Sequence, residues 1–189
     1  MKKLGISLLA ALVALGIAGC GPQEESSKVI TDNDKTTSAA DSGTTSAAED
    51  QKATVGQTVT GEKWAISLTS AKVYDKIDDE YLPMEPAEGK QYLVLFFDVE
   101  NVSAEDDYFN YFNIESYVDG YNSQISVLLG DVDGYETLTG DVAAGKKLQG
   151  CLAWEVDPNW QELEVSYKDD IWTGSKAATF VVTPDQLTA

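Results

Sequence analysis

The side chains that could do chemistry in this sequence are almost all carboxylates. Its 189 residues include 32 acidic and 13 basic ones, for a net charge of −19, and they contain no histidine. All the basic residues are lysine. Histidine is the commonest general base and metal ligand, so its absence excludes Ser-His-Asp, Cys-His and histidine-zinc sites. A nucleic-acid partner is also excluded, because phosphate binding needs clustered positive charge. We therefore expect a protein that is not an enzyme.

The segment LLGDVDGYE offers the best set of oxygen ligands for a metal ion, from Asp131, Asp133 and Glu136. Calcium takes about six to eight oxygens, which an Asp-x-Asp-Gly loop supplies in part. The spacing of an EF-hand is not met. The alternative is ordinary solvated surface charge, which acidic runs usually represent. We expect no resident metal, and these three residues are weak candidates for calcium binding in the millimolar class of extracellular modules.

Cys20 follows an apolar stretch, residues 4–18, that two lysines precede. This pattern is typical of a secretory signal, and the stretch is shorter than the roughly 20 apolar residues of a membrane span. The letters IAG before the cysteine resemble the lipobox of bacterial lipoproteins. The resemblance implies cleavage after residues 1–19, diacylglycerol on the sulfur of Cys20 and an N-acyl chain. The alternatives are an ordinary secretory signal or an uncleaved anchor.

Cys151 would then be the last free thiol and could form no disulfide within the chain. In LQGCLAWEV, strand alternation places it on the face opposite Leu152 and Trp154. A reactive cysteine needs nearby positive charge or a helix N-terminus, and only Lys146 and Lys147 lie close in sequence. We interpret it as a semi-buried structural thiol, with an intermolecular or redox role as the alternative.

Residues 20–52 are rich in Ser, Thr, Ala, Asp and Glu and almost free of large apolar side chains. Such a segment buries too little surface to offset its ordering entropy, so we predict a disordered linker. As a flexible coil it would span about 30 Å, which makes it a tether between lipid and domain. A recognition or glycosylation segment has the same composition and remains an alternative.

Residues 53–189 are predicted to form one all-β domain. The run at 64–77 changes phase near Ser70, which indicates a β-bulge. The run at 91–101 is apolar on both faces as far as Phe97, which is typical of a central strand. Asp119 and Gly120 suit a type I′ hairpin turn. Together with the runs at 57–60, 112–118, 148–156, 162–168 and 177–182, this predicts an antiparallel β-sandwich of about seven or eight strands.

Aromatic residues cluster in DYFNYFNIESYVDGY. If Phe112, Ile114 and Val118 face the core, the alternate face is left with a stripe that could bind a partner. Tyr92 and Phe96 on the central strand would extend it. The alternative is that these rings only pair across strands on the outside of a sheet. The candidate binding residues are Phe109, Tyr111, Tyr117 and Tyr121.

The order of VGQTVTGEKWAISLTSAKVYD, EGKQYLVLFFDVENVS and AAGKKLQGCLAWEV resembles the telokin-like, immunoglobulin-like lipoproteins of Gram-positive bacteria. These form a domain family of unknown function that is related in fold to a mycobacterial secreted immunogenic protein. The resemblance covers nearly all of residues 53–184. It implies an immunoglobulin-like sandwich and an extracytoplasmic location, and it supplies no catalytic motif.

Together these patterns predict a protein held by its lipid on the extracytoplasmic face of the cell membrane of a Gram-positive bacterium. We expect its β-sandwich to be a non-catalytic module that binds an extracellular protein or a cell-wall partner, with no cofactor besides the covalent lipid on Cys20. The alternative function is capture of calcium or a small solute by the acidic loops.

Overall fold

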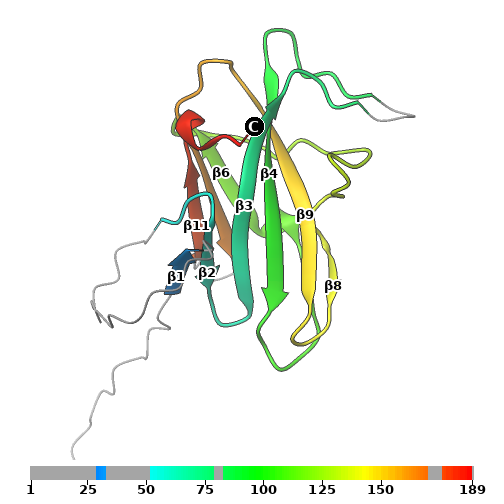
Figure 1. The fold of residues 1–189 in the computed structure, drawn as a ribbon, viewed down its shortest axis with the longest axis vertical. Coiled ribbons are helices and arrows are strands. Elements are labelled where there is room, and N and C mark those ends of the chain that lie inside the picture. Colours follow the sequence, from blue (N-terminus) through cyan, green and yellow to red (C-terminus); the bar gives the residue numbers. More distant parts are fainter. Residues whose placement is uncertain (1–28, 33–51, 79–82, 170–175, 189) are drawn as a thin grey trace, which may run out of the picture.

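Two antiparallel β-sheets stacked face to face make up the domain (Figure 1). The computed structural model describes residues 29–32, 52–78, 83–169 and 176–188. The predicted signal peptide and Cys20 lie outside the described residues. The β-sandwich predicted from the sequence is therefore confirmed for the residues from 52 onward.

The larger sheet, sheet A, has the strand order β1-β2-β3-β4-β9. Its strands are β1 (Val29–Asp32), β2 (Gln57–Thr60), β3 (Trp64–Tyr74), β4 (Gln91–Asn101) and β9 (Lys147–Val156). Sheet B has the order β11-β10-β6-β7. Its strands are β6 (Ile114–Val118), β7 (Tyr121–Asn122), β10 (Leu163–Lys168) and β11 (Lys176–Val182).

Three short pieces complete the described fold. Strands β5 (Asp107–Phe109) and β8 (Gly140–Val142) pair with each other in a separate two-stranded sheet. The 3-10 turn η1 (Tyr111–Asn113) precedes β6, and η2 (Pro184–Gln186) follows β11. Both turns are too short to add a helical layer, so the described domain is all-β.

Local sequence signals specify several of these elements. The register of β3 against β4 shifts between Leu68 and Ser70, which confirms the predicted bulge. Asp119 and Gly120 have φ angles of 51° and 79°, and they join β6 to β7 as the predicted type I′ hairpin. The two-sided apolar run forms β4, which lies between β3 and β9 in the middle of the fold.

The inner core fills the space between the sheets. Leu95 of β4, Trp154 of β9 and Phe180 of β11 are each at most 2% exposed. The indole nitrogen of Trp154 donates a hydrogen bond of 2.8 Å to the Ser116 hydroxyl, so this buried polar group is satisfied. Burying such large side chains supplies most of the free energy that holds the two sheets together.

Strand β1 corrects the prediction of an entirely disordered linker. Val29–Asp32 pairs antiparallel with β2, with Val29 opposite Thr60 and Asp32 opposite Gln57. The linker composition argued against order, but the unpaired edge of β2 offers backbone partners that composition does not reveal. The rest of the predicted linker, up to residue 51, lies outside the described residues.

Candidate functional site

The outer face of sheet A, which points away from sheet B, is divided into a covered half and an open half. Along β4, Tyr92, Val94 and Phe96 are at most 3% exposed on this face. Asp98 and Glu100 continue the same face and are half-buried. The apolar half is covered by the chain's own loops, so the partner surface expected at Tyr92 and Phe96 does not exist there.

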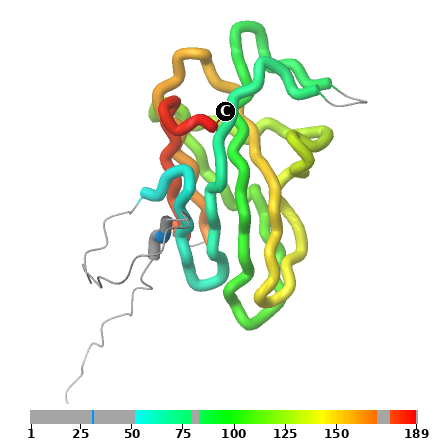
Figure 2. The backbone as a smooth tube through the Cα atoms, viewed as in Figure 1, coloured from blue at the N-terminus to red at the C-terminus, as the bar shows by residue number. Residues whose placement is uncertain are grey.

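Residues 123–138, which we call the cover loop, lie over the apolar half and along the edge of β9 (Figure 2). The Ser126 N–H donates to the Ala153 carbonyl at 2.8 Å. Near the other end, the Cys151 N–H donates to the Glu136 carbonyl at 2.9 Å. Leu128 and Val132 of the loop pack with Phe96 in a second apolar cluster, the outer cluster. The cover loop is therefore held to the sheet at both ends and along its middle.

Asp133 fastens the middle of the cover loop to β3. Its carboxylate accepts hydrogen bonds from the Tyr74 hydroxyl at 2.8 Å and the Lys72 ammonium at 3.1 Å. These bonds lower the pKa of Asp133, and burial together with the bond to Asp133 raises the pKa of Tyr74. Asp133 and Gly134 have φ angles of 54° and 82°, which form a type I′ turn between Val132 and Tyr135.

Two of the three candidate calcium residues, Asp131 and Asp133, form hydrogen bonds at this turn. Asp131 accepts a hydrogen bond of 2.9 Å from the Gly134 N–H, and Asp133 binds Lys72 and Tyr74. In the described part of the chain, no group of three or more acidic or cysteine side chains is placed to hold a metal ion. The structure therefore does not assemble Asp131, Asp133 and Glu136 into a cation site.

Cys151 lies on the outer face of β9, as the alternation predicts, and is fully buried beneath the cover loop. Its Sγ donates a hydrogen bond of 3.3 Å to the Tyr135 carbonyl. Burial raises the pKa of the thiol to about 12, so almost no thiolate forms at neutral pH. The thiol is a packing element of the outer cluster.

The predicted aromatic stripe is wrong at Phe109, and the core position predicted for Phe112 is wrong as well. Phe109 is fully buried in the inner core, 5.3 Å from the ring of Trp64 and 4.6 Å from that of Tyr167. Phe112, which was expected in the core, is 76% exposed. The cause is η1, because a 3-10 turn between β5 and β6 breaks the two-residue alternation on which the prediction depended.

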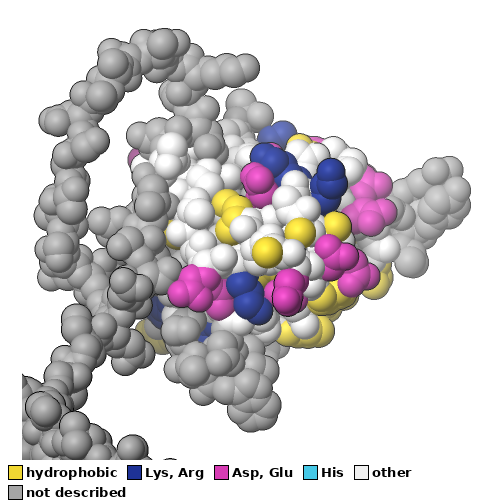
Figure 3. Space-filling model, turned by 90° about the horizontal axis from the view of Figure 1, so that it is seen from below, with side chains coloured by type: hydrophobic (Ala, Val, Ile, Leu, Met, Phe, Trp, Pro, Cys, Tyr) yellow, Lys and Arg dark blue, Asp and Glu magenta, His cyan; other side chains and the backbone are white. Residues whose placement is uncertain are grey.

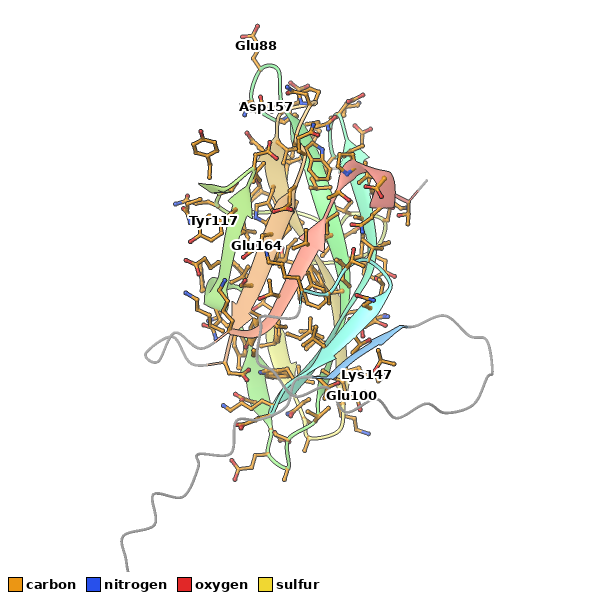
Figure 4. All side chains as sticks on the ribbon, turned by 90° about the vertical axis from the view of Figure 1, so that its left-hand side faces the viewer. Glu88, Glu100, Tyr117, Lys147, Asp157 and Glu164 are labelled. Atoms are coloured by element: carbon orange, nitrogen blue, oxygen red, sulfur yellow. The ribbon has the colours of Figure 1, made fainter. Side chains whose placement is uncertain are left out.

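The other three aromatic residues of the stripe lie in different environments. Tyr111 packs partly against the inner core and contacts the ring of Phe112 at 4.5 Å. Tyr117 lies on the outer face of sheet B, where its hydroxyl donates to Glu115 at 2.7 Å (Figure 4). Tyr121 is 80% exposed at the β6–β7 hairpin. The stripe therefore does not form one surface.

Charged side chains cover the outer face of sheet B. Lys168 pairs with Glu115 at 3.0 Å, and Glu164 lies 2.6 Å from Lys52 and 3.4 Å from Lys176. The hydrogen bonds of Tyr117 and Lys168 lower the pKa of Glu115, and those of Lys52 lower the pKa of Glu164. Carboxylates with lowered pKa values stay ionised, which suits ion pairing and does not suit general-acid catalysis.

The side chains on the open half of sheet A are polar and form hydrogen bonds and ion pairs with one another. Thr58 and Ser67 share a hydrogen bond of 2.7 Å between their hydroxyls, and the amide of Gln149 donates to Asp98 at 2.8 Å. Lys147 pairs with Glu100 at 3.2 Å near the lower end of the domain (Figure 4). All of these residues except Gln149 line a shallow polar concavity.

Two large aliphatic side chains stand out from the cover loop. Val127 and Leu129 are 65% and 64% exposed, whereas Leu128 between them is 8% exposed and anchors the loop. The Leu129 backbone nitrogen lies 3.5 Å from the Met84 sulfur, so the segment at Met84 contacts the cover loop at Leu129. We call Val127 and Leu129 the apolar tip. By contrast, the end of the domain in Figure 3 mixes acidic and basic side chains with a few hydrophobic ones.

The apolar tip is not among the candidate residues predicted from the sequence, although the sequence contains a signal for it. Three consecutive large apolar residues, Val127 to Leu129, end at Gly130. A chain segment packed on one side buries only alternate residues, so such a run outside a two-sided strand predicts exposed apolar side chains.

Among the described residues, no helix has the length and hydropathy needed to cross a membrane. No curated protein sequence matches the chain. The fold is similar to a candidate lipoprotein of Bacillus subtilis, ycdA, at 16% identity and a TM-score of 0.52 over 68% of this chain. The similarity spans only 38% of the ycdA chain.

Two further solved structures are similar. The yjhA protein of Bacillus subtilis matches 69% of this chain and 98% of its own, at 11% identity and a TM-score of 0.50. A candidate lipoprotein of Staphylococcus aureus matches 69% of this chain and 90% of its own, at 15% identity and a TM-score of 0.47. At these identities the similarity concerns the fold alone.

A family model matches residues 37–169, which is most of the chain. The match begins inside the predicted linker and includes β2 to β10, whereas β1 and β11 lie outside it. The family is described as a domain of unknown function, and that description assigns no activity. The chain belongs to the DUF5067 family of domains of unknown function.

Proposed function

We propose that this protein is a lipid-anchored, extracytoplasmic lipoprotein of a Gram-positive bacterium whose sandwich binds another protein through the apolar tip. Candidate lipoproteins among its structural neighbours and the IAG-Cys20 motif support the anchor. The finer resemblance to telokin-like, immunoglobulin-like domains belongs to the same proposal. Binding, not catalysis, agrees with a chain that lacks histidine and arginine.

The single observation that carries the proposal is the exposure of Val127 and Leu129 on a loop that is firmly held. Adjacent exposed aliphatic side chains cost solvation free energy, and such patches commonly mark interaction sites. Backbone bonds to β9 and the Asp133 contacts fix the loop, so little conformational entropy is lost when a partner binds. Loops held by a rigid scaffold are common sites of binding.

The charges beside the apolar tip indicate the chemistry of the partner. Asp131 follows Leu129 closely in the cover loop, and Glu85 follows Met84; both acidic residues are exposed. A complementary surface would have an apolar pocket with lysine or arginine at its rim. Such charges would speed association and exclude acidic competitors.

Binding can be tested by crosslinking the lipoprotein in intact cells and comparing variants. Val127→Ser with Leu129→Ser should abolish a specific crosslink that the soluble domain competes away. If the tip is a hot spot, each truncation weakens binding by about 2 kcal/mol, or about thirtyfold. The matched control is Phe112→Ser, since Phe112 is equally exposed but lies outside the cover loop. Unchanged crosslinking of the double variant would contradict the proposal.

The anchor has its own test. Cys20→Ala should release the protein from the membrane fraction and abolish incorporation of radiolabelled fatty acid. The control is Cys151→Ala, which should leave both unchanged, because that thiol is buried under the cover loop. Membrane retention of Cys20→Ala would contradict the lipid anchor.

A further inference from the structure

Strand β1 and the apolar tip lie at opposite edges of sheet A. In the order β1-β2-β3-β4-β9, β1 forms one edge, and the cover loop extends from the other (Figures 1 and 2). Neighbouring strands are about 4.8 Å apart, so β1 lies about 19 Å from β9. The cover loop lies beyond β9, so the distance from β1 to the tip is larger still.

The pairing of β1 also fixes where the chain from Cys20 reaches the domain. Val29 lies opposite Thr60, next to the turn that connects β2 to β3. Residues 21–28 separate Cys20 from β1, and eight residues reach at most about 29 Å in any conformation. Without β1, the chain first joins the domain at Ala53, which forms backbone hydrogen bonds with β11, and residues 21–52 reach at most about 115 Å.

We propose that β1 is a clamp that orients the domain on the membrane, with the β1–β2 edge toward the lipid and the apolar tip facing outward. This inference rests on the lipid anchor of the proposed function. A short connection to one edge restrains rotation of the domain, whereas a connection several times longer would let either edge approach the bilayer. The partner then meets the apolar tip from the side away from the membrane.

Proline substitution separates the clamp from the domain. Successive N–H groups of a strand point to opposite sides, so of two adjacent residues in β1 one donates toward β2. Ile30→Pro with Thr31→Pro therefore removes a ladder donor whichever residue supplies it. Lys35→Pro with Thr36→Pro is the matched control, because it adds the same two prolines outside β1.

The orientation can be measured by energy transfer from a dye on the protein to an acceptor on lipid headgroups. The full-length precursor is expressed in a bacterium that processes lipoproteins, and the product is reconstituted into phosphatidylcholine vesicles. Glu62→Cys places a dye beside Thr60, and Gln124→Cys places one in the cover loop; both positions are exposed. Cys151 is buried, so a short labelling time modifies the introduced cysteine and leaves Cys151 unmodified.

We expect stronger transfer from position 62 than from position 124 in the native chain. The difference should disappear in Ile30→Pro with Thr31→Pro and persist in Lys35→Pro with Thr36→Pro. Equal transfer from both positions in the native chain, or a difference that survives the β1 prolines, would overturn the clamp. Thermal unfolding of each variant shows whether the sandwich itself is intact.

Flotation of the vesicles distinguishes this inference from the proposed function. A chain that does not float with the vesicles overturns both the lipid anchor and the clamp. A chain that floats but transfers energy equally from both positions overturns the clamp alone. Neither result depends on binding at the apolar tip, so that part of the proposed function is tested separately.

Discussion

The two faces of β4 are equally apolar along the first half of the strand and differ along the second. On the inner face, Leu93, Leu95, Phe97 and Val99 remain buried against sheet B throughout. On the outer face, burial in the outer cluster ends at Phe96, and Asp98 and Glu100 follow. The inner face is covered by a whole sheet and the outer face by loops, namely the cover loop and the paired segments at Ile77 and Met84.

This difference shows how the fold produces a binding surface. An apolar half-face must be covered, and here a loop without long strands covers it. A loop has room to bury only some of its side chains, so Leu128 points inward while Val127 and Leu129 remain exposed. The need to cover β4 thus gives the domain both a fixed loop and the apolar tip.

The largest expected effect comes from truncating the inner face. Leu95→Ala should reduce the free energy of unfolding by about 4 kcal/mol, because a fully buried leucine is replaced by a cavity between two sheets. Phe96→Ala on the outer face should cost less, about 3 kcal/mol, since the cover loop can settle into the space. Urea unfolding followed by tryptophan fluorescence measures both. An outer-face loss larger than the inner one would contradict the comparison.

Gly150→Ala should act on the cover loop directly. A Cβ at this position of β9 would lie 2.7 Å from the Leu138 Cα and 3.0 Å from the Glu136 carbonyl oxygen, so the end of the loop must move. We expect a loss of about 2 kcal/mol.

Labelling of the Cys151 thiol by a maleimide reports this motion, because the thiol reacts only when the cover opens. Each 1.4 kcal/mol by which a substitution lowers the free energy of opening of the cover loop raises the labelling rate about tenfold. Gly61→Ala is the control, since the added Cβ would lie 3.6 Å from its nearest neighbour, the Trp64 carbonyl oxygen. Unchanged labelling in Gly150→Ala would show that the loop end is not held against β9.

The elements that the sequence predicts well are those whose signal is local. The alternation of β4, the bulge near Ser70 and the Asp119-Gly120 turn each depend on a few neighbouring residues. The exchanged positions of Phe109 and Phe112 show the limit. The 3-10 turn at Tyr111–Asn113 places Phe112 outward, whereas Ile114 and Val118 after the turn pack against the inner core as predicted, and no residue type in YFN requires that turn.

The place of the apolar tip in the fold and the pairing of β1 could not be predicted for a different reason. Their positions depend on partners far away in sequence: the edge of β9 for the cover loop, and the edge of β2 for Val29–Asp32. The sequence does indicate that β4 needs a second cover, but it does not say which segment provides it. Asp131 and Asp133 are weak calcium candidates in the sequence because a type I′ turn and a ligand loop share the same Asp-x-Asp-Gly pattern.

A smaller effect is expected for the contact that fastens the cover loop to β3. The lowered pKa of Asp133 means that its carboxylate stabilises the fold at pH values above about 3.9, its ordinary pKa, and that this contribution is lost as pH falls through the folded value. Because the Asp133 side chain is 46% exposed, the contribution is about 0.5 kcal/mol.

Asp133→Asn should therefore reduce stability at pH 7 and flatten its decline toward pH 3. Asparagine tolerates the positive φ of this turn, so the backbone is retained. Unfolding free energies at low salt, measured at both pH values, test the prediction. The slope that remains is due to other carboxylates, including Glu115 and Glu164, whose pKa values are also lowered. A slope identical to that of the unaltered chain would contradict the role of Asp133.

The smallest effect is expected on the open half of the same face. Lys147 is 66% exposed in its pair with Glu100, so Lys147→Ala should change the free energy of unfolding by less than about 0.5 kcal/mol. Labelling of Cys151 should stay unchanged, because the pair lies outside the outer cluster. A loss above about 1 kcal/mol would mean that the open half is as tightly coupled to the fold as the covered half. Phe96 would then no longer mark the boundary between the half of the outer face that stabilises the fold and the half that is exposed to solvent.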